Sequence, residues 1–107
     1  MNSKRIILVI LAYFSHGTYG NTEFVRCAAF VKRSPPVDAT DETKLRVYSF
    51  FKQATDGDCP KSRIYTLIGI RKVKLEAWCS LHGMSANQAQ TEYVKMIDSM
   101  VPNWRNM

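Results

Sequence analysis

The stretch VYSFFKQATDGD, residues 47–58, decides the fold predicted for this chain. A helix has about 3.6 residues per turn, so one side of this stretch is apolar and predicts a core face: Val47, Phe50 and Ala54. The other side carries residues spaced at i, i+3, i+4 and i+7: Tyr48, Phe51, Lys52 and Thr55. This second side places two aromatic rings around one ammonium. It is either the solvated edge of an amphipathic helix or a site for an anion that also has a flat ring.

Cap signals and apolar spacing predict four helices. The first starts at Asn21 or Thr22 and stops before Pro35-Pro36, because proline lacks the amide hydrogen that a helix needs. The second runs from an N-cap at Thr40 to Asp56-Gly57, where glycine permits a left-handed backbone. The third covers residues 72–81, with Val73, Ala77 and Leu81 spaced by four and Gly83 as its C-cap signal.

The fourth helix follows a capping box formed by Ser85 and Gln88, and it runs to about Val101 before Pro102. Its predicted inner face comprises Ala86, Ala89, Tyr93, Met96, Ile97 and Met100. Residues 59–71 show no clean periodicity. We expect a folded loop with a turn of helix there, because a lone strand would have no partner. The fold class is therefore all-α, a small helical bundle.

Length and charge limit the classes of partner. The 107 residues predict an N-terminal extension, residues 1–20, and one domain, residues 21–107. The net charge of +6 suits an anionic partner such as a phosphorylated small molecule, a nucleic acid or an anionic membrane. Because the basic residues do not cluster along one helix, nucleic acid is the less favoured of these. The sequence shows no nucleophile, acid/base pair or metal cluster, so an enzyme is not expected.

Three cysteines at wide spacing, Cys27, Cys59 and Cys79, do not form a disulfide framework or a zinc motif. We expect reduced thiols in a cytoplasmic protein. The two histidines, His16 and His82, have no obvious Cys or Asp partner in sequence and are expected at the surface.

Residues 1–20 contain a basic pair, Lys4-Arg5, followed by nine apolar residues, 6–14. The run is too short for a bilayer, which needs about 20 residues. It fits a secretory signal or marginal membrane tether, with Gly20 near a candidate cleavage point. It also fits an apolar extension that packs on the domain. The signal interpretation implies a secretory or membrane-tethered location and conflicts with unpaired cysteines.

Residues 48–58, with KLEAW at 74–78 and GMS at 83–85, resemble the acyl-CoA-binding protein family. The family pattern reads Y-x-x-Y-K-Q-A-T-x-G-D, then K-W-x-A-W and G-x-S, with a tyrosine in the last helix that Tyr93 matches. The resemblance covers about residues 22–101. Phe51 replaces a tyrosine and loses its hydroxyl, Leu75 replaces a tryptophan, and Ile64-Tyr65 replaces a common Pro-Gly pair.

The resemblance implies a four-helix, up-down-down-up bundle that binds medium- and long-chain fatty acyl-CoA. It implies that Tyr48 and Lys52 contact the 3′-phosphate, with Lys74 as a second cation and Phe51 against adenine. The implied binding residues are Lys32, Tyr48, Ser49, Phe50, Phe51, Lys52, Lys74 and Tyr93, although Phe50 falls on the core side of its helix. Ala28 and Val31 help to form the implied groove for the acyl chain.

The expected function is therefore a monomeric, non-enzymatic carrier of fatty acyl-CoA in lipid metabolism, with no cofactor and no metal. It would deliver its ligand to acyl-transferring enzymes or membranes. The alternatives are a degenerate member that keeps the fold as an interaction module and, less favoured, a basic helical domain for nucleic acid. The departures at Phe51, Leu75 and Ile64-Tyr65 motivate the first alternative.

Overall fold

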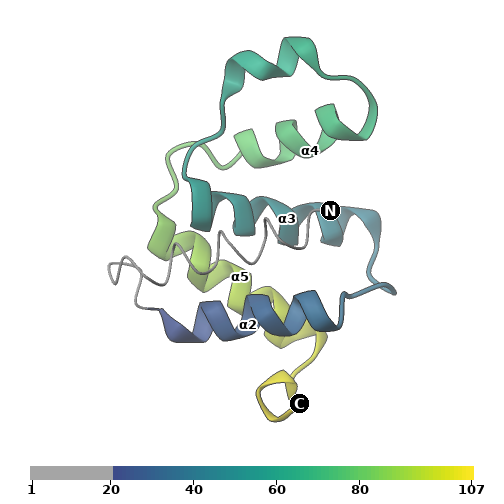
Figure 1. Ribbon diagram of the computed structural model, residues 1–107, viewed down its shortest axis with the longest axis vertical. Helices are drawn as coiled ribbons and strands as arrows, with labels where there is room; N and C mark the ends of the chain where they lie inside the picture. Colours follow the sequence, from purple (N-terminus) through teal and green to yellow (C-terminus); the bar gives the residue numbers. More distant parts are fainter. Residues whose placement is uncertain (1–20) are drawn as a thin grey trace.

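The structure, a computed structural model, describes residues 21–107. The predictions for residues 1–20 lie outside this part of the chain. Four long helices and two short 3-10 helices follow one another, with no strand among the described residues. They are α2 (Thr22–Arg33), α3 (Asp41–Asp56), η1 (Lys61–Thr66), α4 (Gly69–Cys79), α5 (Ala86–Met100) and η2 (Trp104–Asn106). The predicted all-α bundle is confirmed, with α3 between α4 on one side and α2 and α5 on the other (Figure 1).

Side-chain caps fix three helix starts where the sequence predicts them. The side chains of Asn21, Thr40 and Ser85 each accept a hydrogen bond from the backbone N–H three residues later, at 3.0 to 3.1 Å. Each bond satisfies one of the N–H groups that the first turn leaves without a partner. Gly57 ends α3 with φ at +77°, the left-handed backbone that favours glycine.

The third helix differs from its prediction at both ends. It begins at Gly69, three residues before the predicted Lys72, and it ends at Cys79 with Ser80 as its C-cap. Its first residue, Gly69, lies in the stretch predicted as a loop and has φ at +64°. The η1 helix confirms the expected helical turn in the preceding loop.

The buried face of α4 also differs from the predicted stripe of Val73, Ala77 and Leu81. Leu75 and Trp78 are the buried residues of this helix, and Val73 is 42% exposed. The reason is the way α4 packs on α3: the Trp78 indole Nε1–H donates a 2.8 Å hydrogen bond to the carbonyl of Gly57. With Leu75 and Trp78 facing inward, Val73 lies on another side of the helix.

The core consists of two clusters of buried side chains. The larger one joins α2, α3, α5 and η2 and includes Val47, Phe50 and Ala54, as the core face predicts. On α5, the residues buried are Ala89, Gln90, Tyr93, Val94 and Ile97, whereas Met96 and Met100 are only partly buried. The smaller cluster lies under η1 and α4 and comprises Cys59, Leu75 and Trp78, with Tyr48 packed against it.

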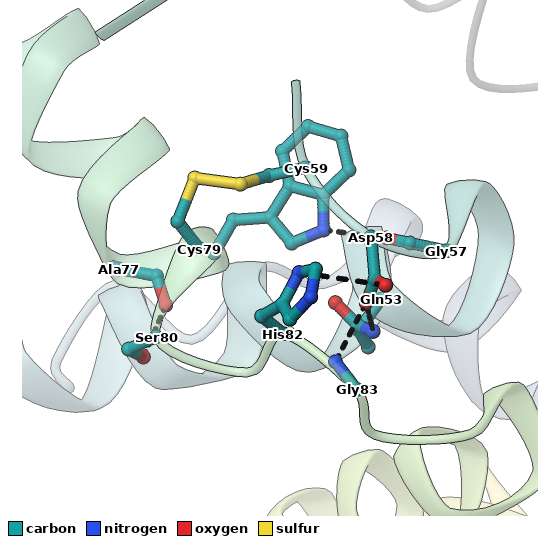
Figure 2. Close-up of a disulfide and its surroundings, with 10 residues drawn as sticks. Gln53, Gly57, Asp58, Cys59, Ala77, Cys79, Ser80, His82 and Gly83 are labelled. Carbon is teal, nitrogen blue, oxygen red and sulfur yellow. Dashed lines mark hydrogen bonds and ion pairs between the residues drawn. A yellow bond between two sulfur atoms is a disulfide. The ribbon is translucent and has the colours of Figure 1, made fainter. Parts of the chain in front are cut away.

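The prediction of three reduced thiols is wrong for two of them, because Cys59 and Cys79 form a disulfide (Figure 2). Cys59 follows the end of α3 and Cys79 ends α4, and the packing of these helices brings their Cα atoms to 5.2 Å. This Cα distance suits a disulfide. The separation of 20 residues in sequence does not indicate that the two cysteines meet. Cys27 keeps a free, buried thiol.

Asp58 ties the end of α3 to the turn before α5, as Figure 2 shows. Its Oδ1 accepts hydrogen bonds from Gln53 Nε2 and from the backbone N–H of Gly83, both at 2.8 Å. These bonds, that from Gly83 first, lower the pKa of Asp58. His82 Nδ1 lies 3.4 Å from Asp58 Oδ2. This exposed histidine therefore has an Asp partner that is not obvious from the sequence. Gln53, Gly57 and Asp58 therefore have structural roles.

Candidate functional site

A pocket of about 420 Å³ lies between α2 and α3. Its volume falls within the range of small-molecule sites, and most of its lining is apolar. Six residues predicted for the site lie in its wall: Ala28, Val31, Lys32, Tyr48, Phe51 and Tyr93. Residues from three helices that are far apart in sequence thus meet at one cavity.

Three aromatic rings form one packed group beside the pocket. The centroids of Phe51 and Tyr93 are 6.0 Å apart, and Phe24 meets Tyr93 edge-on at 5.2 Å. Tyr93 is 2% exposed, and burial raises the pKa of its hydroxyl, which therefore stays neutral. This contact holds the Phe51 ring in place without the hydroxyl that the family pattern has at that position.

Tyr48, at the edge of the pocket, has one ammonium group over its ring and a second lysine one helical turn away. Lys74 Nζ lies 4.7 Å from the centroid of the Tyr48 ring, which brings α4 to the site. Lys52 stands one helical turn after Tyr48. Burial raises the pKa of Tyr48, and the charge of Lys52 opposes this rise. A phenol with lysines on two neighbouring helices beside it suits a phosphate group.

Lys52 makes two further contacts that set its position. Its Nζ lies 4.8 Å from the centroid of the Trp78 ring, and it forms an ion pair with Asp56 one turn later. Lys52 and Lys74 do not line the pocket itself but stand beside Tyr48, which does. Their roles toward a ligand stay predictions from the family resemblance.

Ser49 and Phe50 are not brought to the pocket. Both are buried, and the Ser49 hydroxyl donates a 2.7 Å hydrogen bond to the carbonyl of Leu45 within the same helix. Phe50 belongs to the larger core cluster. Their predicted contact with a ligand stays a prediction. In this structure Ser49 bonds within α3 and Phe50 packs in the core.

Five residues in the pocket wall were not predicted as part of the site: Pro35, Pro36, Val37, Lys44 and Val47. The sequence assigns the two prolines only one role, which is to end the first helix. Lys44 carried a usable signal, because it precedes Tyr48 by one helical turn and shares its side of α3. Lys44 and Lys32 are two lysines in the wall of a mostly apolar cavity.

Within residues 21–107, His, Cys, Asp and Glu side chains form no group of three that could hold a metal ion. Burial, with a smaller effect from Asp98, raises the pKa of Cys27 to about 12, so its thiol stays protonated and is a poor nucleophile. None of the helices in this part of the chain is long and apolar enough to cross a membrane.

Comparison with known proteins agrees with this geometry. The zebrafish "Acyl-CoA-binding domain-containing protein 5-B" is 41% identical over 64 residues, and the human "Enoyl-CoA delta isomerase 2" is 37% identical over 68. These alignments cover 60% and 62% of this chain but only 16% and 17% of those longer proteins. The mouse "Diazepam-binding inhibitor-like 5" is 39% identical over 75 residues, which are 69% of this chain and 83% of that protein. The model of the family described as "Acyl CoA binding protein" matches residues 21–97, so the chain belongs to this family.

Proposed function

We propose that the protein binds medium- and long-chain fatty acyl-CoA thioesters reversibly and acts as their carrier. The observation that carries this proposal is the position of Tyr48, which lines an apolar pocket, has the ammonium group of Lys74 over its ring and lies one helical turn before Lys52. A ligand with a phosphate group, a flat ring and a long alkyl chain matches the lysines, the aromatic rings and the apolar pocket in turn. The family match and the names of the relatives support acyl-CoA as this ligand.

The polar end of the ligand would lie at Tyr48. Lysine serves phosphate as a compact point charge. Lys74 of α4 lies over the Tyr48 ring, and Lys52 follows Tyr48 by one turn of α3. The Phe51 ring, half-buried beside Tyr93, offers a face for adenine to stack on. The missing hydroxyl at Phe51 removes a hydrogen bond and leaves the stacking surface.

The acyl chain would occupy the pocket between α2 and α3. Ala28, Val31 and Val47 provide apolar walls, with the two prolines of residues 35–36 at the end of α2. Each buried methylene is worth about 0.8 kcal/mol, so chain length dominates the affinity of otherwise equal ligands until the pocket is full. No chemical step is needed, and we propose a carrier without catalytic activity that delivers its ligand to acyl-transferring enzymes or membranes.

Calorimetry of the 107-residue chain with palmitoyl-CoA, octanoyl-CoA and free coenzyme A tests this proposal. Palmitoyl-CoA is expected to bind most tightly and free coenzyme A most weakly, with up to about fourfold in affinity for each buried methylene. A duplex oligonucleotide serves as the control for charge alone. Absence of heat at micromolar palmitoyl-CoA would overturn the carrier proposal and favour an interaction module that keeps only the fold.

We propose, second, that the protein matures in an oxidising compartment. The cytoplasmic expectation rested on reduced cysteines, and the pairing of Cys59 with Cys79 removes most of that support. Disulfides persist in secreted and lumenal proteins and are rare in the cytosol. The signal-like pattern of residues 1–20 now agrees with the cysteines, where before it conflicted with them.

A mass measurement on the protein from its own cells separates the two locations. The protein is denatured and alkylated without reduction, then weighed intact. The expected result is one alkylated thiol, that of Cys27, and loss of the signal-like segment. Three alkylated thiols on a chain that keeps residues 1–20 would instead support the cytoplasmic expectation.

A further inference from the structure

The segment of residues 61–74 exposes large apolar side chains that the fold does not use. Tyr65 is 91% exposed, Ile68 86%, Ile70 65% and Val73 42%. Exposed apolar residues are ordinary when they stand singly, but four of them within nine residues make a patch. Figure 1 shows that η1 and α4, which carry them, lie at the end of the molecule away from the C-terminus. We call this surface the 61–74 patch.

The same segment has a one-sided charge. Its basic residues alternate with the apolar ones, and no acidic residue occurs from position 59 to 75: Lys61, Arg63, Arg71, Lys72 and Lys74. All but Lys74 are exposed. The ion pairs seen within residues 21–107 are formed by other side chains, so internal salt bridges do not neutralise this charge.

We propose that the 61–74 patch docks the protein on anionic phospholipid membranes. Basic side chains interleaved with exposed aliphatic and aromatic ones are the combination that binds the headgroup region of such a bilayer. The cations meet the lipid phosphates, and Tyr65, Ile68 and Ile70 enter the boundary with the acyl chains. The four exposed apolar side chains can enter the lipid without unfolding the domain, because none of them is part of either core cluster.

Other occupants fit the patch less well. Nucleic acid would use the charge, but aliphatic side chains such as Ile68 and Ile70 give a base nothing to stack on. A second copy of the chain would bring five more positive charges against the first five, which repel. An anionic lipid surface matches both the charge and the apolar side chains.

The patch adjoins the candidate site along α4. Ile70 and Lys74 stand one helical turn apart, and Lys74 reaches the Tyr48 ring at the edge of the pocket. A protein docked through this helix holds the entrance of its pocket near the bilayer. The docking itself does not depend on the ligand and is tested without it.

Hydrogen exchange of the ligand-free, 107-residue protein with vesicles locates the contact directly. Vesicles of phosphatidylcholine with phosphatidylserine are expected to protect the amides of residues 64–73, and vesicles of phosphatidylcholine alone to protect them much less. Residues 1–20 are followed separately in the same spectra, so an effect of the apolar N-terminus is not mistaken for docking. Protection confined to residues 1–20, or equal protection by both vesicles, would overturn the proposal.

A pair of matched variants then measures the contribution of charge. Each basic side chain near an anionic bilayer strengthens binding about fivefold, so Lys72→Glu is expected to weaken vesicle binding about 25-fold. The control is Lys95→Glu, at an exposed helical lysine on α5 that is outside the patch and lies 3.9 Å from Glu92. Equal losses in the two variants, tighter binding to an oligonucleotide than to vesicles, or dimers that protect the patch by themselves would each contradict membrane docking.

A second matched pair measures the apolar contribution. Ile68→Ser is expected to weaken vesicle binding about tenfold, since a buried isoleucine side chain is worth at least that much. Met107→Ser removes an apolar side chain of comparable exposure, 66%, at the opposite end of the molecule and is expected to change little. No difference between them would show that the apolar part of the patch stays in water.

Discussion

Alanine at Lys52 is expected to weaken palmitoyl-CoA binding about 10- to 100-fold. A charge-assisted hydrogen bond is worth about 1.5–3 kcal/mol, and the phosphate loses one such partner at Tyr48. The substitution also leaves the Asp56 carboxylate, now without its ion pair, near the same phosphate. Calorimetry with palmitoyl-CoA measures the loss, and the same titration with Lys74→Ala tests the second cation.

The control for Lys52 is Lys95→Ala, which removes one positive charge from an exposed position on α5. Its affinity is expected to stay within twofold of the parent protein, because an exposed, distant charge is screened by salt. Thermal unfolding of both variants shows whether loss of the Lys52 contact with Trp78 changes the fold instead. Equal affinity for Lys52→Ala and the parent would remove Lys52 from the ligand site.

Alanine at Trp104 is expected to lower the free energy of unfolding by about 3–5 kcal/mol, the usual cost of removing a buried tryptophan. Trp104 is 3% exposed and packs against Phe30, with ring centroids 6.1 Å apart. Its indole Nε1–H donates a 2.7 Å hydrogen bond to Asp98 Oδ1. The substitution therefore leaves a cavity between α2 and η2 and removes one hydrogen bond from Asp98.

Denaturant unfolding followed by circular dichroism measures this effect. The matched control is Met107→Ala, three residues later and 66% exposed, for which a change below about 0.5 kcal/mol is expected. Met107 takes no part in the ion pairs of Arg105 with Asp98 and Glu23, whereas Trp104→Ala also removes the ring that lies 4.6 Å from the Arg105 guanidinium. A loss below about 1 kcal/mol for Trp104→Ala would mean that η2 is not part of the core.

Much of the fold follows from local chemistry that a sequence displays. Asn21, Thr40 and Ser85 act as N-caps where capping preferences predict them, and Gly57 ends α3. The two sides of α3 separate as the helical spacing predicts, with Val47 buried and Tyr48 at the pocket. These features depend on residues within one or two turns of each other, so their spacing is sufficient information.

The rest depends on contacts between segments that are distant in sequence. Cys59 meets Cys79 only because α4 folds back along α3, and the same packing makes Leu75 rather than Val73 the buried residue. Trp104 falls after the last predicted helix, in a segment with no periodicity to mark it as core. For the site, the family pattern supplied Tyr48, Lys52 and Lys74, and helical spacing pointed to Lys44, whereas Pro35 and Pro36 required knowledge of where the pocket lies.

Tyr48 belongs to two neighbourhoods at once, since it lines the pocket and packs on the cluster beneath α4. Binding at the pocket and docking of α4 on α3 are therefore thermodynamically linked. A ligand that binds only when Tyr48 and Lys74 are in place stabilises the packing of α4 on α3. This stabilisation grows with the logarithm of the ligand concentration. Occupancy of the pocket by such a ligand is therefore expected to suppress local opening of the η1–α4 region and to slow proteolysis there.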